Sequence, residues 1–436
     1  MPIGIDTVKI SRMQHLVDIG LPDKIFTAYE REYILSKKNP NQTAAGIYAA
    51  KEAVLKALGT GITLPLHEVC INHLPQGNPD AALSGNALEA AMNMGIHEFE
   101  LSITHDGEYA TAAAYACVDT HMKYYRQALQ KLCNAPDNAI STRQVMKLLP
   151  QRESATHKGS YGRVYVLAGS VGLTGAAIMA CNAVLKCGAG LITLGCAREL
   201  NTIFEISLRE VMTKPLPSEN GIINAQNTAE ICADAANADV CLIGPGLGRS
   251  QSINQIIMNI LSMEDTPCVI DADGLNAIAD DISVLRGHKS ELILTPHIGE
   301  FARLTGLSAE EILKDPCAAA ADFAKEYRVT LVLKSHRTVI ADPHGNVCVN
   351  LLGNPGMATG GTGDVLSGTI TSFAAQGKGM DNAAVMGVYL HSLAADMASY
   401  DKGEYSLTPT DIVEYLPYAV KYTQKEMLPR CVPGQK

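Results

Sequence analysis

Hydrophobic positions in the last two thirds of the chain form short, continuous runs separated by longer stretches of helical periodicity. The runs are RVYVLAG (163–169), ITLGC (192–196), DVCLIG (239–244), CVIDAD (268–273), ELILTP (291–296) and TLVLKS (330–335). Such runs, rich in Val, Ile and Leu, are typical of strands buried on both faces of a sheet. Because helical stretches separate most of them, we predict an α/β domain with a mainly parallel sheet and helices on both faces.

The first 118 residues show a different pattern, in which short strands flank one amphipathic helix. Residues 42–58 have apolar residues at helical spacing and end at the turn Gly59-Thr60-Gly61. The strand signals are GIDTV (4–8), VCI (69–71) and the hairpin formed by LSITH (101–105), DGE and YATAAAYACV (109–118). We therefore predict an α+β domain over residues 1–118.

A polar stretch separates the two patterns. Residues 119–158 are rich in Gln, Lys and Arg and predict a helix followed by a loop. We place a linker at 119–139 and the α/β domain at 140–436. The length of 436 residues fits two or three domains of roughly 150 residues each.

Composition and charge narrow the function classes. The net charge of −10 argues against broad, nonspecific nucleic-acid binding. The 12 cysteines include no C-x-x-C pair and no zinc spacing, which fits reduced thiols. The sequence has no basic-then-apolar start and no apolar run of about 18 residues. We expect a soluble cytoplasmic protein without nucleic-acid or membrane partners.

The candidate chemistry lies in glycine- and histidine-bearing segments that follow the predicted strands. In open α/β sheets, ligands bind at the carboxyl ends of the strands. The last segment is NPGMATGGTGDVLSG (354–368), where backbone N–H groups and a helix start predict an anion-binding site. Asp364 in this loop is either a base for a hydroxyl that attacks phosphorus or only a helix cap.

Two common nucleotide-binding motifs are excluded by spacing. The sequence has no G-x-x-x-x-G-K-[ST], so it is not a P-loop NTPase. The segment GPGLGR (244–249) follows a strand but lacks the third glycine of the dinucleotide fingerprint, which argues against an ordinary dehydrogenase.

The motifs of the α/β domain resemble those of a known enzyme family. They are HKGSYGRVYVLAGSVGLTGA (157–176), KCGAGLITL (186–194), GPGLG (244–248), IDADGLN (270–276), TPHIGEFARLTG (295–306), KSHRT (334–338) and the loop at 354–368. Their order and spacing resemble the ADP/ATP-dependent NAD(P)H-hydrate dehydratases, which have a ribokinase-like fold. That family phosphorylates the ring hydroxyl of hydrated NADH or NADPH with a nucleotide, after which phosphate leaves and the double bond returns.

The resemblance implies residue roles. Asp364 is the base, and the N–H groups of Gly361 and Gly363 form the anion hole. The hydrated dinucleotide is expected to lie against Ala176, Gly246, His297 and Asp364; for His297 alone, the alternative is a buried, hydrogen-bonded histidine. ADP or ATP phosphates are expected to bind Lys334, Ser335, His336, Arg337 and Thr338. Ile298 and Ser335 stand where the family usually has Pro and Gly.

The N-terminal domain resembles a second family. From periodicity alone, Glu52 and Lys56 form an i,i+4 ion pair on a solvated helix face. However, GID (4–6), FTAYE (26–30), KEAVLKALGTG (51–61) and LSITHDGEYA (101–110) together resemble the holo-[acyl-carrier-protein] synthases. Enzymes of that family transfer 4′-phosphopantetheine from coenzyme A (CoA) to a serine of acyl carrier protein.

This second resemblance implies a Mg²⁺ site and a CoA site. Asp6 and Glu52 match the Mg²⁺ ligands, and a pyrophosphate at the reacting centre suits a cation with oxygen ligands. CoA is expected to contact Lys56, Arg12 and Gly59, while His105 either contacts CoA or helps to deprotonate the serine. Ile47 and Asn78 replace basic residues of the family. The family's active site forms between subunits of a trimer, so we expect a homo-oligomer.

We therefore predict a bifunctional enzyme, with a cofactor-repair dehydratase following a phosphopantetheinyl transferase. The alternative is a small-molecule kinase for a vitamin precursor, fused to an inactive N-terminal oligomerisation module. The preference for ADP or ATP, and for NADH or NADPH hydrate, is left open by the sequence.

Overall fold

The computed structural model describes residues 2–74, 77–133 and 135–424. The chain divides into two compact units, residues 1–127 and 128–425, each with its own core. The division falls inside the segment predicted as a linker, while the domain limits 1–118 and 140–436 stay a prediction. Residues 425–436 of the predicted second domain lie outside the described part.

The first unit is an α+β structure built on an antiparallel sheet. Its strands lie in the order β1-β5-β4, where β1 is Ile3–Lys9, β5 is Tyr109–Val118 and β4 is Ile96–Asp106. The predicted hairpin is confirmed, although β4 begins before the predicted residue 101. The smaller elements are α1 (Gln14–Asp18), α2 (Ala28–Leu35), β2 (Val69–His73), β3 (Pro79–Leu83), α4 (Gly85–Asn93) and α5 (Thr120–Leu129).

One long helix, α3 (Pro40–Ala57), covers one face of this sheet. Small side chains let the helix approach closely: a Cβ at Gly4 would overlap the carbonyl oxygen of Ala53. Ile47, where the resembling family has a basic residue, is buried in this core. The helix also buries Lys51, whose Nζ lies 2.7 Å from the carboxylate of Glu30.

The second unit contains a nine-stranded sheet with the order β16-β15-β14-β13-β12-β11-β6-β7-β8. The strands from β14 to β8 are parallel, whereas β15 and β16 add an antiparallel edge. The bounds are β6 (Arg163–Leu167), β7 (Leu191–Ala197), β8 (Met212–Leu216), β11 (Val240–Ile243), β12 (Cys268–Ile270), β13 (Leu292–Leu294), β14 (Thr330–Leu333), β15 (Val339–Ala341) and β16 (Val347–Val349). The predicted mainly parallel sheet is confirmed.

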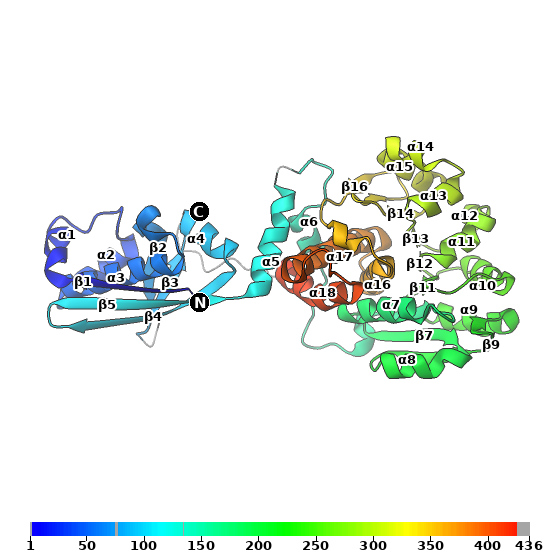
Figure 1. The fold of residues 1–436 in the computed structure, drawn as a ribbon, viewed down its shortest axis with the longest axis horizontal. Coiled ribbons are helices and arrows are strands. Elements are labelled where there is room, and N and C mark those ends of the chain that lie inside the picture. The colour runs from blue at the N-terminus through cyan, green and yellow to red at the C-terminus, as the bar shows by residue number, and fades with distance from the viewer. Residues whose placement is uncertain (1, 75–76, 134, 425–436) are drawn as a thin grey trace. The chain divides into compact units, whose positions relative to one another are not determined.

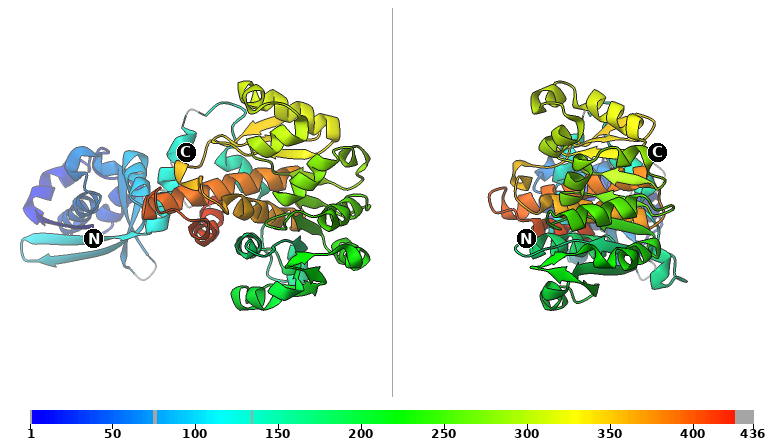
Figure 2. Two further views of the ribbon diagram at one scale, coloured as in Figure 1. Left: turned by 45° about the vertical axis from the view of Figure 1, so that its right-hand side comes forward. Right: turned by 90° about the vertical axis from the view of Figure 1, so that its right-hand side faces the viewer.

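Helices cover both faces of the sheet (Figure 1). One face carries α7 (Thr174–Lys186), α16 (Thr362–Ala375), α17 (Met380–Lys402) and α18 (Pro409–Gln424), and α16 and α17 run side by side (Figure 2). The other face carries α9 (Thr228–Ala236), α10 (Gln251–Leu261), α11 (Asp273–Asp280), α12 (Val284–Gly287), α13 (Ile298–Thr305) and α15 (Pro316–Tyr327). The remaining elements are α6 (Thr142–Leu148), α8 (Asn201–Ser207), α14 (Ala309–Lys314) and the short hairpin β9 (Ser218–Glu219) and β10 (Ile222–Ile223).

The strand order creates a topological switch point beside β6. The chain passes from β6 to β7 on one side and later returns to place β11 on the other side of β6. At such a point the loops after the two strands diverge and leave a crevice, in which ligands of open α/β sheets bind. By this rule, the ligand site is expected at the loops that follow β6 and β11.

Candidate active sites

The loops after β6 and β11 are hydrogen-bonded to each other at this switch point. The N–H of Gly169 donates to the carbonyl oxygen of Pro245 (2.9 Å), and the hydroxyl of Ser170 donates to that of Gly246 (2.9 Å). A Cβ at Gly246 would lie 2.9 Å from the Cβ of Ala176, so the first turn of α7 touches this loop. The structure therefore brings the predicted residues Ala176 and Gly246 together.

The start of α16 contains Gly361 and Gly363, whose N–H groups were predicted to bind an anion. Gly361 precedes the helix with φ of +99°, and a Cβ there would overlap the side chain of Met179 on α7. At Gly363, a Cβ would lie 3.3 Å from Nζ of Lys334. The backbone of this turn thus lies against a cation, and its unpaired N–H groups present the positive end of the helix dipole.

Asp364 lies in the same turn, beside a cluster of charged groups. Lys334 Nζ lies 2.7 Å from Asp271 Oδ1 and 3.9 Å from Glu300 Oε2. Burial and the negative charge of Asp271 raise the pKa of Asp364 to about 7, with Lys334 opposing the shift. A carboxyl group with this pKa accepts a proton near neutral pH, as a general base must.

The capping alternative for Asp364 is wrong. The residue that precedes the first turn of α16 is Gly361, and no side chain caps this helix. Asp364 lies within the helix, so its side chain is not in the N-cap position.

The alternative for His297, a buried and hydrogen-bonded histidine, is not what the structure shows. Its side chain is 56% exposed, so it is not a buried histidine. Its Nδ1 accepts hydrogen bonds from the N–H groups of Gly299 (2.9 Å) and Glu300 (3.2 Å), which caps α13. A neutral ring with this contact carries its proton on Nε2, and that N–H can donate to a ligand. His297 pairs with Lys334 in an isolated parallel bridge, so it lies close to the charged cluster.

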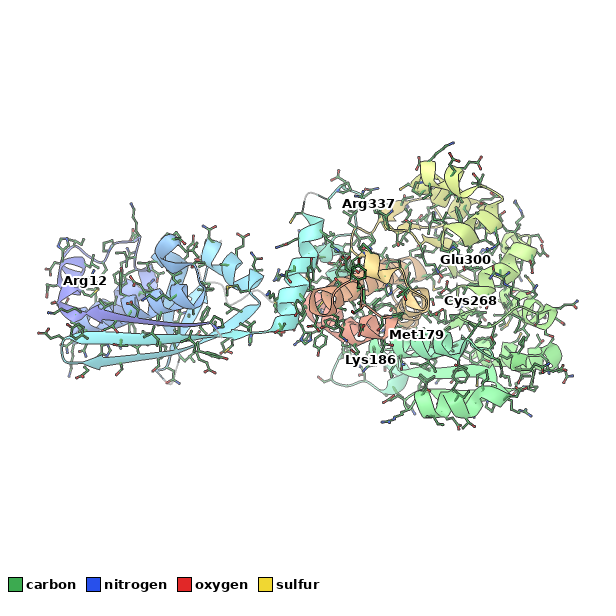
Figure 3. The ribbon with its side chains drawn as sticks, in the orientation of Figure 1. Arg12, Met179, Lys186, Cys268, Glu300 and Arg337 are labelled. Carbon is green, nitrogen blue, oxygen red and sulfur yellow. The ribbon has the colours of Figure 1, made fainter. Side chains whose placement is uncertain are left out.

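The predicted phosphate-binding segment forms the turn between β14 and β15. The hydroxyl of Ser335 donates to the carbonyl oxygen of Arg337 (2.7 Å), and that of Thr338 donates to the carbonyl oxygen of Ser335 (3.3 Å). Both hydroxyls are therefore hydrogen-bonded within the turn. His336 and Arg337 are exposed, while Lys334 points into the charged cluster. Figure 3 labels Arg337, and also Glu300 of that cluster.

In the first unit, the predicted metal ligands lie between the sheet and α3. Lys56 Nζ binds Asp6 Oδ1 (2.7 Å) and the carbonyl oxygen of Ile5 (3.0 Å). The second oxygen of Asp6, Oδ2, is buried and has no hydrogen-bond partner. Burial raises the pKa of Glu52, and the neighbouring Asp6 raises it further. Two facing carboxylates with an unpaired oxygen fit a Mg²⁺ ion, which uses one or two carboxylates together with phosphate oxygens.

Tyr48 is part of this site and was missed by the sequence analysis. Its hydroxyl lies beside Glu52, and burial together with this carboxylate raises the pKa of Tyr48 to about 12. The positive charge of Arg12 also acts on Tyr48 and opposes this shift. The signal in the sequence was the i,i+4 spacing of Tyr48 and Glu52 on one helix.

His105 lies on the α3-facing side of β4. In the sheet register, His105 pairs with Ala110, which also pairs with Val8; Asp6 lies two residues before Val8 and shares its face. A Cβ at Gly46 would lie only 2.9 Å from Nε2 of His105, so a larger residue there would displace this ring. Gly59 ends the α3 segment with φ of +69°, as the predicted turn requires. Both roles considered for His105 stay predictions.

Two further findings concern the described residues as a whole. In residues 2–74, 77–133 and 135–424, no group of three or more His, Cys, Asp or Glu side chains is arranged to hold a metal ion. In the same ranges, no helix is long and apolar enough to cross a membrane.

Comparison with protein families assigns the second unit. Residues 164–418 match the family described as NAD(P)H-hydrate dehydratase. The chain belongs to this family. Residues 2–114 match the family described as the 4′-phosphopantetheinyl transferase superfamily. Both resemblances inferred from the motifs are therefore confirmed.

Individual relatives support the same assignment. The bifunctional NAD(P)H-hydrate repair enzyme of Moorella thermoacetica is 43% identical over 280 residues, which are 64% of this chain and 53% of that enzyme. The chain thus spans about half the length of that relative. The ADP-dependent (S)-NAD(P)H-hydrate dehydratase of Listeria monocytogenes is 34% identical over 65% of this chain and 96% of its own length.

A solved structure confirms the fold of the dehydratase unit. The ADP/ATP-dependent NAD(P)H-hydrate dehydratase of Bacillus subtilis, co-crystallised with ATP and Mg²⁺, is 28% identical with a TM-score of 0.57. The similarity covers 66% of this chain and 99% of that structure. The predicted ribokinase-like fold is therefore correct.

The charged partners of Asp364 in the dehydratase unit were not predicted. Asp271 and Glu300 lie within the quoted motifs IDADGLN and TPHIGE, but only the sheet order shows that they meet at Lys334. A signal was available, since acidic residues followed two predicted strands whose carboxyl ends share one edge of the sheet.

Proposed function

We propose that the second unit restores NADH or NADPH from its hydrate at the expense of ADP or ATP. The observation that carries this proposal is the position of Asp364, a carboxyl group with a pKa of about 7 in the first turn of α16, beside Lys334. Membership of the dehydratase family supports the substrate class.

In the proposed reaction, Asp364 removes the proton from the hydroxyl group on the nicotinamide ring. The hydroxyl oxygen then attacks the terminal phosphorus of the nucleotide, and the bond from that phosphorus to the shortened nucleotide breaks. The N–H groups at Gly361 and Gly363 stabilise the charge on the transferred phosphoryl oxygens. Phosphate then leaves the ring with the hydroxyl oxygen, a neighbouring ring carbon loses a proton, and the double bond returns.

The remaining residues are proposed to bind the two substrates. The dinucleotide hydrate lies in the crevice at Ala176 and Gly246, with the Nε2 proton of His297 as a donor. The nucleotide lies over the β14–β15 turn, where Lys334, Ser335, His336, Arg337 and Thr338 were predicted to bind its phosphates. Since both hydroxyls of this turn are engaged internally, its donors to phosphate are backbone N–H groups and the exposed guanidinium group of Arg337.

The test is to supply hydrated NADH with Mg²⁺ and either ADP or ATP and to follow the return of the reduced-nicotinamide absorbance. We expect nucleotide-dependent recovery, which Asp364→Asn abolishes while nucleotide binding persists. A stable phosphorylated product from a small alcohol, without recovery of NADH, would instead support the kinase alternative. The relatives from Moorella thermoacetica and Listeria monocytogenes, a hydrate-repair enzyme and a hydrate dehydratase, support dehydration over this alternative.

We further propose that the first unit transfers 4′-phosphopantetheine from CoA to a serine of acyl carrier protein. Support comes from the superfamily match and from the unpaired Asp6 Oδ2 facing Glu52. Mg²⁺ bound there would neutralise the pyrophosphate of CoA and polarise it for attack. Lys56, which pairs with Asp6 in the structure, is then available to a CoA phosphate, with Arg12 and Gly59 at the edges of the site.

Mass spectrometry of an apo carrier protein, mixed with the enzyme, CoA and Mg²⁺, tests this second activity. We expect the carrier to gain one phosphopantetheine group, and Asp6→Asn to prevent the gain. If several carriers gain no mass with the wild-type enzyme, the transferase proposal fails and the inactive-module alternative stands.

A homo-oligomer is proposed on the basis of the open face of the first sheet. Ile3 and Ile5 on β1 and Tyr109 on β5 are 56%, 58% and 48% exposed, on the face opposite α3. Exposed apolar side chains grouped on one sheet face indicate an interaction surface. Light scattering should give a multiple of the chain mass, and Ile5→Lys should lower it.

A further inference from the structure

The loop that leads into α16 is bound by a lysine from far upstream in the chain. Lys131 follows α5, in the short helical turn Gln130–Leu132. Its Nζ donates to the carbonyl oxygen of Gly353 (2.7 Å) and binds Asp396 Oδ1 (2.7 Å). One side chain thus joins the start of this loop to α17.

Lys131 supplies the positive charge that the buried carboxylate of Asp396 needs. Its carboxylate is fully buried, whereas the Lys131 side chain is 34% exposed. Asp396 Oδ2 accepts the N–H of Gly353 (2.9 Å), and Oδ1 accepts the side-chain amide of Asn354 (2.9 Å). A buried carboxylate that loses its counter-charge is strongly unfavourable, so Lys131 stabilises the form of the loop in which these contacts exist.

The same helix supports the rest of the loop. Ser392 accepts the side-chain amide of Asn350 (3.0 Å), which also donates to the carbonyl oxygen of Leu352 (2.9 Å). At the other end, the buried ring of His391 interacts with the backbone of Thr362, and burial lowers the pKa of His391 to about 4, which keeps it neutral. α17 therefore holds the loop where it begins and where it becomes α16.

The segment that follows Lys131 also forms hydrogen bonds with the end of β16. The N–H of Val349, at the end of β16, donates to the carbonyl oxygen of Asn138 (2.9 Å), and the N–H of Ile140 donates back to Val349 (3.0 Å). This segment lies upstream of residues 164–418, which match the dehydratase family. The support of the loop therefore includes residues outside that match.

We propose that Lys131 is a positioning residue for phosphoryl transfer by the second unit. It holds the loop from Asn350 to Gly361, and through it the N–H groups at Gly361 and Gly363, in the geometry that the transferred phosphoryl group requires. Lys131 acts through Gly353 and Asp396. The inference rests on the proposed dehydratase function, because that function defines the reaction that the loop serves.

The test compares Lys131→Met with Lys131→Arg in the full chain. The matched control is Lys147→Met, which removes an exposed lysine of α6. We expect Lys131→Met to lower kcat for NADH-hydrate dehydration by about tenfold or more, because small displacements of preorganised donors are costly. KM for the hydrate should change by less than about twofold, since the crevice at Ala176 is not altered. Lys131→Arg should restore most of kcat, and Lys147→Met should match the wild type.

Hydrogen exchange of the same variants separates positioning from general stability. In Lys131→Met we expect faster exchange confined to residues 350–362. Wild-type kcat with unchanged exchange in this loop would overturn the proposal. Faster exchange throughout the second unit would also overturn it, since the lysine would then be a general stabiliser. If the wild-type enzyme shows no dehydration, the proposed function fails, and loop-confined exchange still decides whether Lys131 holds the loop.

Discussion

At the scale of single residues, Asp364 should set the pH dependence of the dehydratase. Its pKa is raised to about 7, and the proposed base must be deprotonated to accept the hydroxyl proton. We expect kcat/KM for NADH hydrate to rise with pH and to level off above about pH 7, as a single ionisation. Lys334→Met removes the group that opposes the shift, so the midpoint should move to higher pH. A profile that is flat between pH 6 and 8 would contradict the base role.

Asp364 should also lower the stability of the folded protein at neutral and higher pH, because folding raises the pKa of this carboxyl group. A carboxyl group with a raised pKa stabilises the folded state fully below its unfolded pKa of about 3.8, and this stability is lost as pH rises through about 7. Asp364→Asn removes the charge, so we expect a higher melting temperature than wild type at pH 8 and a smaller difference at pH 5. An equal difference at both pH values would show that the charge is not the cause.

Tyr48 should orient Glu52 for the metal ion. In Tyr48→Phe the carboxylate loses the neighbouring hydroxyl group but keeps its place on α3. We expect the Mg²⁺ concentration needed for half-maximal transfer to rise about three- to tenfold, since an ordinary polar contact of this kind contributes about 1 kcal/mol. The maximal rate at saturating Mg²⁺ should change little. Tyr33→Phe, on α2, is the matched control for loss of a phenol hydroxyl.

At the scale of elements, the turn between β12 and α11 stores backbone strain. Ala272 has φ of +48° and ψ of −114°, a conformation that favours glycine, and it lies between Asp271 and Asp273. We expect Ala272→Gly to raise the free energy of unfolding by about 1 kcal/mol, because relief of strain outweighs the greater entropy of glycine. The turn also directs Asp271 toward Lys334. A more flexible glycine should hold Asp271 less firmly, so we expect kcat for NADH-hydrate dehydration to fall.

The control for this turn is Asp265→Gly, which removes another residue with positive φ (+55°) from a turn that the site does not use. It should leave kcat unchanged. If Ala272→Gly lowers stability, the strain in this turn is not the dominant effect.

The sequence predicted the elements best where hydrophobic runs were long enough to show a period. Six of the seven parallel strands were found because their runs are buried on both faces, as at VCLI (240–243). The strands VIA (339–341) and VCV (347–349) were missed because three residues give no period, and the parallel strand MTKPL (212–216) was missed because Thr213 and Lys214 interrupt its apolar residues. Motifs placed Asp364 and Gly363 in one loop, but the pairing of Lys334 with Asp271 depends on strand order, which local patterns do not encode.

At the scale of the whole molecule, the two units should respond separately to damage in their cores. The core of the first unit is built from residues between Val8 and Ala116, and it contains the buried pair of Lys51 and Glu30. Lys51 also donates to the carbonyl oxygens of Leu66 and Val69, so its loss leaves a buried carboxylate and unpaired acceptors. Removing one partner of a buried pair costs about 3–5 kcal/mol.

We therefore expect Lys51→Met to lower the melting transition of the first unit and to abolish phosphopantetheine transfer at 37 °C. The transition of the second unit and the recovery of NADH should stay at wild-type values, because no core residue of that unit is altered. Calorimetry with both assays on one preparation measures this, and Lys24→Met, an exposed lysine, is the matched control. If both transitions fall together, the two units fold as one cooperative structure, and the two activities then share a common dependence on stability.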